Sequence, residues 1–153
     1  MTNYNELKKI LISLIENNEY DIQILSNASA ILNDYIENIN WVGFYLLKDN
    51  RLILGPFQGH PACINIPLNK GVCGMCASNK ETIVVENVHE FKTHIACDSA
   101  SNSEICIPIF KNDNLYGLLD IDSPILNRFN EFDKTNLEQI VKIIEDVIKF
   151  TKS

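Results

Sequence analysis

The stretch His94–Glu104 combines a cysteine, a histidine, two acids and several small hydroxyl residues, and no other part of the chain does so. Runs of Ser, Asn and Asp favour bonds from side chain to nearby backbone, so we expect a loop laid over a sheet, with the Cys97 thiol exposed. Cysteine reacts as the thiolate, whose pKa a neighbouring imidazolium lowers. A reactive thiol is one interpretation of Cys97, and an incidental half-buried thiol beside a chance histidine is the other.

Four further cysteines fall into two groups. Cys63 and Cys73 lie in or beside turns and next to small residues, so we expect both thiols to be reachable from solution. Cys106 lies within an apolar strand pattern and Cys76 one turn inside a short helix. These two are expected to be buried and to act as small hydrophobic residues.

Cys73-Gly-Met-Cys76 is the only C-x-x-C pattern in the chain. A structural zinc site usually takes two such pairs, or one pair with two histidines. A thioredoxin-type motif needs a strand–helix–strand setting that this region lacks. The pattern therefore does not predict a metal. A set of Cys73, Cys76, Cys97 and a histidine assembled in space stays as the alternative.

Acidic and aromatic side chains are expected near the ends of strands. Asp120 and Asp122 alternate with apolar residues and so share one face, close to Glu104 on a neighbouring strand. Such acids suit a ligand with an ammonium group, and crowding raises the pKa of one so that it can donate a proton. A solvated strand end is the plainer interpretation. Trp41 and Tyr45 also share a face, as core residues or as the walls of a small-ligand pocket.

The elements that position these residues follow from periodicity, caps and turns. We expect helices from Asn3 to Asn17, at 21–38, at 72–78 and from Asn130 onward. We expect strands at 41–47, 51–54, 62–67, 82–85, 104–110 and 114–122, with a loop at 55–61 and a bulge or open edge at Pro108. This order predicts an α+β fold, with a mostly antiparallel central sheet and the N- and C-terminal helices packed on one face.

Length and composition narrow the class of protein. The 153 residues fit a single domain, 1–153. The net charge of −7 disfavours nucleic acid and anionic membranes as partners. There is neither a signal-peptide pattern nor an apolar run of transmembrane length, which predicts a cytoplasmic protein. In that compartment cysteines are more often catalytic or metal-binding than structural.

Five sequence blocks, taken together, resemble the signature blocks of the free methionine-(R)-sulfoxide reductases, which are stand-alone GAF domains. The blocks are Gly55-Pro-Phe-Gln-Gly59, Gly71-Val-Cys-Gly74, His94-Ile-Ala-Cys-Asp98, Ser101-Asn-Ser-Glu104 and Leu119-Asp-Ile-Asp-Ser123. The blocks follow one another in the order expected for this family and, together with Trp41, span residues 41–123. The resemblance implies a GAF-like fold and reduction of free L-methionine-(R)-sulfoxide rather than of the oxidised residue in proteins.

The resemblance also implies roles for three cysteines. Cys97 is the candidate nucleophile and Cys63 the main resolving thiol, with Cys73 as an alternative resolver. A sulfenic acid on Cys97 would condense with a nearby thiol, and thioredoxin would reduce the disulfide. No metal or organic cofactor is implied. Cys76 departs from the family pattern and adds the chance of a stray disulfide with Cys73.

By the same resemblance, Glu104, Asp120 and Asp122 are substrate-binding acids, and Asp122 or Glu104 is the proton donor. Trp41 and Tyr45 match the aromatic walls that receive the methyl end of the substrate. Two other classes stay open: a GAF sensor of a small ligand, and a cysteine-based redox or nitric-oxide sensor. A homodimer through the terminal helices is also left open, because their apolar faces fit a core equally well.

Overall fold

The computed structural model describes residues 1–92 and 100–149, so His94 and Cys97 lie outside the described residues. Its helices are α1 (Tyr4–Ile15), α2 (Asp21–Tyr35), α3 (Gly71–Asn79) and α4 (Glu131–Glu145), with a single 3-10 turn at Val88–Glu90. Its strands are β1 (Trp41–Lys48), β2 (Arg51–Gly59), β3 (Asn65–Pro67), β4 (Ile83–Val85), β5 (Ser103–Lys111) and β6 (Asn114–Ser123).

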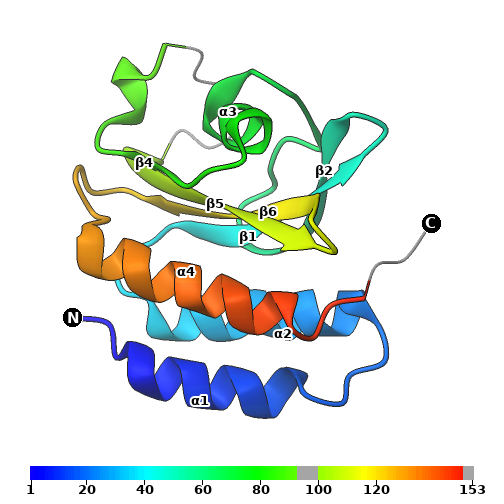
Figure 1. The fold of residues 1–153 in the computed structure, drawn as a ribbon. Helices are drawn as coiled ribbons and strands as arrows, with labels where there is room; N and C mark the ends of the chain where they lie inside the picture. Colours follow the sequence, from blue (N-terminus) through cyan, green and yellow to red (C-terminus); the bar gives the residue numbers. More distant parts are fainter. Residues whose placement is uncertain (93–99, 150–153) are drawn as a thin grey trace.

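The six strands form one sheet in the order β3-β2-β1-β6-β5-β4, and every neighbouring pair is antiparallel (Figure 1). The two long hairpins, β1–β2 and β5–β6, meet through the pairing of β1 with β6 at the centre of the sheet. The α+β prediction with an antiparallel sheet is therefore confirmed.

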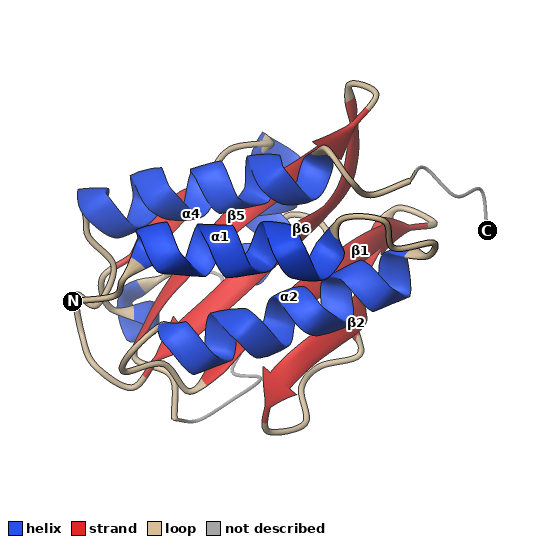
Figure 2. Ribbon diagram, turned by 90° about the horizontal axis from the view of Figure 1, so that it is seen from below, coloured by secondary structure: helices blue, strands red, loops and turns tan. Residues whose placement is uncertain are grey.

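Helices cover the two faces of the sheet unequally. On one face, α2 and α4 lie against the strands and α1 packs on those two helices (Figures 1 and 2). On the other face α3 lies across β5 and β6 (Figure 1). The helix-side core takes alternate strand residues, among them Val42, Phe44, Ile105, Ile107, Leu119 and Ile121. Among the described helices, none combines the length and apolar character needed to cross a bilayer.

Side-chain caps begin helices α1 and α4, and tight turns connect the strands of the two hairpins. The Asn3 side chain accepts a bond from the Glu6 amide at 3.2 Å and starts α1. Asn130 and Asp133 bond each other's backbone amides in a capping box that starts α4. Positive φ angles at the centres of both hairpins, 49–50 and 112–113, match the twist of two-residue turns.

Three boundaries differ from the sequence prediction. The glycine- and proline-rich stretch 55–59 belongs to β2, because a bulge at Gly55-Pro56 opposite Phe44 keeps the strand paired with β1. The strand predicted at 62–67 begins only at Asn65, and α2 ends at Tyr35. The expectation for Pro108 is confirmed: β4 pairs only with residues 104–106, and the register shifts just beyond, at Ile109.

Candidate active site

Two rows of side chains cross β5, β6 and β1 on the sheet face that α3 covers. In the first row Glu104 lies opposite Asp122, and Asp122 lies opposite Trp41. The second row, offset by two residues on each strand, consists of Cys106, Asp120 and Gly43. The alternating residues Leu119 and Ile121 face the helix-side core instead. The predicted common face of Asp120 and Asp122 follows from this register.

Helix α3 places Cys73 directly over the two rows. The Cys73 Sγ lies 3.7 Å from the Glu104 Oε2 and 3.3 Å from the Cys106 Sγ. Cys73 is only 5 % exposed, so the expectation that its thiol is reachable from solution is wrong. The reason is that the Cys73 side chain faces Glu104 and Cys106 on the sheet. The helix also packs closely on β3, where a Cβ atom added to Gly74 would stand 2.5 Å from the Pro67 carbonyl oxygen.

Cys76 and Cys106 are fully buried, as the sequence predicts. Cys106 nevertheless does more than fill space, because its thiol donates to the Asp120 Oδ1 at 3.2 Å. Period-two alternation with Glu104 carries the signal that Cys106 faces the acids. The contact of Cys106 with Cys73 joins a strand to a distant helix and has no local signal.

Burial is the largest cause of the pKa shifts of Glu104 and Asp120. It raises the pKa of Glu104 well above its usual range, and the negative charges of Asp120 and Asp122 raise it further. Burial also raises the pKa of Asp120, although hydrogen bonds from Glu104 and from the thiols of Cys106 and Cys73 oppose the rise. The crowding of the three acids that the sequence predicts is thus present, and it shifts the pKa of Glu104 in the direction expected for a proton donor.

The Cys73 thiol stays protonated near neutral pH. Its hydrogen bond with Cys106 lowers its pKa, but burial and the charges of Asp120 and Asp122 outweigh that effect and raise the pKa to about 12. A buried thiol of this kind is a poor nucleophile.

Aromatic rings continue the first row toward β2. Trp41 stacks on Tyr45 with ring centroids 5.9 Å apart, and on Phe57 at 5.2 Å. The sequence prediction includes the first two rings and misses Phe57, because β2 was expected to end before it. The Trp41 Nε1 donates to the His60 carbonyl, and the Tyr45 hydroxyl donates to the Cys63 carbonyl at 2.8 Å. These bonds fix the loop that carries Cys63 beside the rings.

Cys63 is half-buried in the loop before β3 and is disulfide-bonded, whereas the other cysteines of the described ranges, Cys73, Cys76 and Cys106, carry free thiols. The structure thus brings Trp41, Tyr45, Glu104, Asp120, Asp122 and Cys73 to one sheet face, with Cys63 beside the aromatic rings. The prediction for Cys97 lies outside the described residues.

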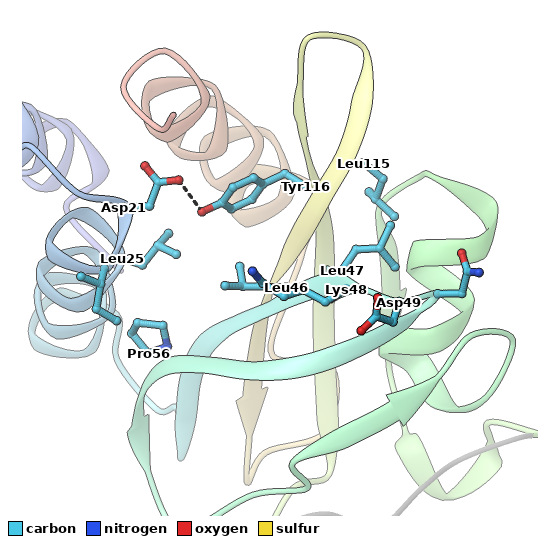
Figure 3. A pocket seen from close by; sticks show the side chains of 11 residues that line it. Asp21, Leu25, Leu46, Leu47, Lys48, Asp49, Pro56, Leu115 and Tyr116 are labelled. Carbon is cyan, nitrogen blue, oxygen red and sulfur yellow. Dashed lines mark hydrogen bonds between the residues drawn. The ribbon is translucent and has the colours of Figure 1, made fainter. Parts of the chain in front are cut away.

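A separate cavity of about 420 Å³ opens at the other end of the sheet, near the β1–β2 turn and α2 (Figure 3). Its walls include Leu25, Leu46, Pro56 and Tyr116, whose hydroxyl donates to Asp21 at 2.8 Å. It shares no residue with the two rows and contains no thiol. The acids and cysteines beneath α3 are therefore the better candidate for chemistry.

Comparison with known proteins agrees with this geometry. The GAF domain model matches residues 22–148. The free methionine-R-sulfoxide reductase of Escherichia coli is 43 % identical over 148 residues, which cover 97 % of this chain and 90 % of that protein. The chain belongs to the free methionine-R-sulfoxide reductase family.

Two solved structures extend the match to this reductase family in three dimensions. A reduced fRMsr of Staphylococcus aureus is 60 % identical, covers 97 % of both chains and superposes with a TM-score of 0.95. The free methionine-R-sulfoxide reductase of Neisseria meningitidis, solved with its substrate, is 38 % identical with a TM-score of 0.90, and the match covers 94 % of this chain and 86 % of that one. The family and the GAF fold expected from the five sequence blocks are confirmed.

Proposed function

We propose that the protein reduces free L-methionine-(R)-sulfoxide to L-methionine through a cysteine sulfenic acid and an intramolecular disulfide. The observation that carries the proposal is the in-register row of Glu104, Asp122 and Trp41, which sets two buried acids beside an aromatic wall. Such a row matches a zwitterionic amino acid with an apolar end. Family membership supports the same substrate.

The acids explain a preference for the free amino acid. Glu104, Asp120 and Asp122 bind the substrate ammonium, a group that peptide-bonded methionine lacks. The amides in the first turn of α3, at Gly71–Cys73, suit the substrate carboxylate. Trp41, beside Tyr45 and Phe57, receives the methyl end.

The proposed reaction needs two thiols, a protonated acid and an external dithiol reductant. The Cys97 thiolate attacks the sulfoxide sulfur, and a protonated acid, Glu104 or Asp122, donates a proton to the oxygen. Methionine leaves with its sulfur reduced, and Cys97 becomes a sulfenic acid. A second thiol attacks that sulfur, releases water and forms a disulfide. A cytoplasmic dithiol protein of the thioredoxin type reduces the disulfide and restores both thiols.

Cys63 is the better resolving thiol. It is half-buried beside the aromatic wall, and its position in the fold allows a disulfide, as a resolving thiol requires. Cys73 is almost fully buried, and its raised pKa leaves little thiolate near neutral pH. We therefore assign the resolving role to Cys63 and keep Cys73 as the alternative.

Turnover by the wild type and by Cys97→Ser, measured side by side, tests the proposal. Each protein receives free methionine sulfoxide and dithiothreitol, and methionine is quantified. The wild type should complete many turnovers with the R epimer and none with the S epimer, and Cys97→Ser should complete none. Binding of the sulfoxide without turnover would instead identify a sensor and end the reductase proposal.

Replacing Asp120 and Asp122 by Asn tests the role of the acids. Each charged contact to the ammonium contributes about 1.5–3 kcal/mol, so KM for the free sulfoxide should rise at least about tenfold. The matched control is Asp113→Asn, a carboxylate in the exposed turn between β5 and β6, which should leave KM unchanged. Wild-type kinetic constants in the double variant would refute ammonium binding by these acids.

A further inference from the structure

Four donor atoms converge beneath α3. The sulfur atoms of Cys73 and Cys106 and a carboxylate oxygen each from Glu104 and Asp120 all lie within 4.8 Å of one another. The two sulfurs are 3.3 Å apart, and the Cys106 Sγ lies 3.2 Å from the Asp120 Oδ1. The proposed reaction uses the two acids and leaves this pair of thiols unexplained.

The spacing of these atoms fits a tetrahedral cation. Zinc binds thiolate sulfur at about 2.3 Å and carboxylate oxygen at about 2.0–2.2 Å, so a tetrahedral site has donor-to-donor distances of roughly 3.3–3.8 Å. Four of the six donor pairs have contacts from 3.2 Å between Cys106 and Asp120 to 3.8 Å between Cys106 and Glu104, with Cys73 to Glu104 at 3.7 Å, and the other two pairs lie within 4.8 Å. Small side-chain adjustments are enough to reach coordination geometry.

The charge and burial of the cluster favour a cation as well. All four residues are buried, and the salt bridges found within 1–92 and 100–149 include neither Glu104 nor Asp120. A thiol-binding divalent ion would neutralise the charge of the acids and would deprotonate the thiols as it binds. Two thiolates also select zinc over magnesium or calcium, which prefer oxygen ligands.

We propose that Cys73, Cys106, Glu104 and Asp120 form a binding site for Zn²⁺ beneath α3. The site shares Cys73 with the set considered in the sequence analysis, Cys73, Cys76, Cys97 and a histidine, and differs from it in the other three ligands. A cation held by Glu104 and Asp120 occupies the acids that would bind the substrate ammonium. Zinc is therefore a competitive inhibitor of the reductase, and this consequence alone rests on the proposed function.

Cobalt spectroscopy tests the site directly. The protein is reduced with a phosphine, stripped with a chelator and titrated anaerobically with Co²⁺, which reports thiolate ligands by charge-transfer absorbance and tetrahedral geometry by its visible bands. We expect one equivalent of Co²⁺ to bind and one equivalent of Zn²⁺ to displace it. Absence of thiolate charge-transfer absorbance in the wild type would overturn the proposal.

Three variants assign the ligands. Cys106→Val keeps the size and apolar character of the side chain, and Co²⁺ binding should weaken at least about tenfold or disappear. The matched control Cys76→Ala removes a buried thiol of α3 that hydrogen-bonds to Cys106 without belonging to the four donors, and it should keep the thiolate charge-transfer absorbance. The double variant Cys63→Ser with Cys97→Ser should also keep it. Wild-type absorbance in Cys106→Val, or its loss in the double variant, would place the metal elsewhere.

Folding and activity provide independent measurements. Circular dichroism establishes whether Cys106→Val is folded, and Cys106→Ala replaces it if it is not. Zinc should raise the Tm of the wild type with increasing concentration and leave that of the folded Cys106 variant unchanged. Zinc should raise KM for the sulfoxide in the wild type and not in the variant. If no reductase activity exists, the cobalt spectrum and the Tm shift still decide whether the site binds metal.

Discussion

Glu104 lowers the stability of the fold when it is charged, and it has a proposed role in the reaction. A carboxyl group in an apolar environment beside two other acids is unfavourable in its charged form. The folded protein therefore retains a proton on Glu104 at pH values where the unfolded chain has released it. In the proposed mechanism Glu104 is, with Asp122, one of the two candidates to give the departing oxygen its proton.

The pH dependence of stability should reveal this proton. Because the folded pKa of Glu104 lies above its usual value of 4.5, its contribution to the unfolding free energy is fully present below pH 4.5 and is lost as the pH rises toward the raised pKa. Glu104→Gln has no ionisable group at this position, so its unfolding free energy does not include this decrease with rising pH. As the pH rises from 4.5 to 8, the stability of Glu104→Gln relative to the wild type should therefore increase. Urea unfolding across this range measures the difference.

The matched control is Glu81→Gln, an exposed acid, whose stability difference from the wild type should stay constant over the same range. An equally constant difference for Glu104→Gln would show that Glu104 ionises normally in the folded protein.

The residues differ in how well the sequence predicts them. Asp120 and Asp122 follow from alternation with Leu119 and Ile121, because the period of a strand decides the face. Exposure of Cys73 was mispredicted, since a turn-flanked thiol carries no sign of the element that packs on it. The catalytic and substrate-binding roles stay predictions at the level of single residues.

Among the elements, α3 determines how deeply the acids and thiols of the site are buried. Almost all its residues are small or apolar and the helix is buried on most sides, so its sequence lacks the polar face that would show which side meets the sheet. This explains why the helix itself was predictable and its packing was not. The same applies to β2, whose glycines and proline are typical of a loop and are accommodated here by a bulge.

Gly74→Ala tests the close packing of α3. The added methyl group would stand 2.5 Å from the Pro67 carbonyl oxygen, a backbone atom, so the helix must shift away from its neighbours. We expect a loss of about 1–3 kcal/mol in unfolding free energy and a rise in KM, because the first turn of α3 moves with the helix. Denaturant unfolding and steady-state kinetics measure the two effects.

Asn79→Ala provides the control within the same helix. Asn79 is the exposed last residue of α3, and its replacement should change stability by less than about 0.5 kcal/mol. Equal stability of Gly74→Ala and Asn79→Ala would contradict the close approach of α3 to Pro67.

At the scale of the whole molecule, the sheet separates two cores. The helix-side core contains residues of α1, α2 and α4, and the other core contains Trp41, Tyr45 and the three free cysteines. The larger hydrophobic core and the candidate active site therefore lie on opposite faces of the sheet. Local patterns predicted the hairpins and the helices, but the pairing of β1 with β6 joins residues 71 to 81 positions apart and has no local signal. The assignment of 1–153 to one domain and the homodimer stay predictions.

Leu11→Ala tests this separation. Leu11 is fully buried in α1, and its truncation leaves a cavity that costs about 2–5 kcal/mol in unfolding free energy. Because α1 reaches the sheet through α2 and α4, KM and kcat should be unchanged well below the Tm. The control is Ile12→Ala on the same helix, where the side chain is 45 % exposed and the loss should be much smaller. A large change in KM for Leu11→Ala would show that the two faces are coupled.

The alternation of β5 and β6 limits how the length of this hairpin can change during evolution. An inserted or deleted single residue that no bulge absorbs would turn every following side chain of the strand to the opposite face, exchanging Asp120 and Asp122 with Leu119 and Ile121. The acids would then enter the helix-side core, and Leu119 and Ile121 would face the thiols. Length variation among relatives that keep the site should therefore occur in the 112–113 turn, at a bulge or two residues at a time.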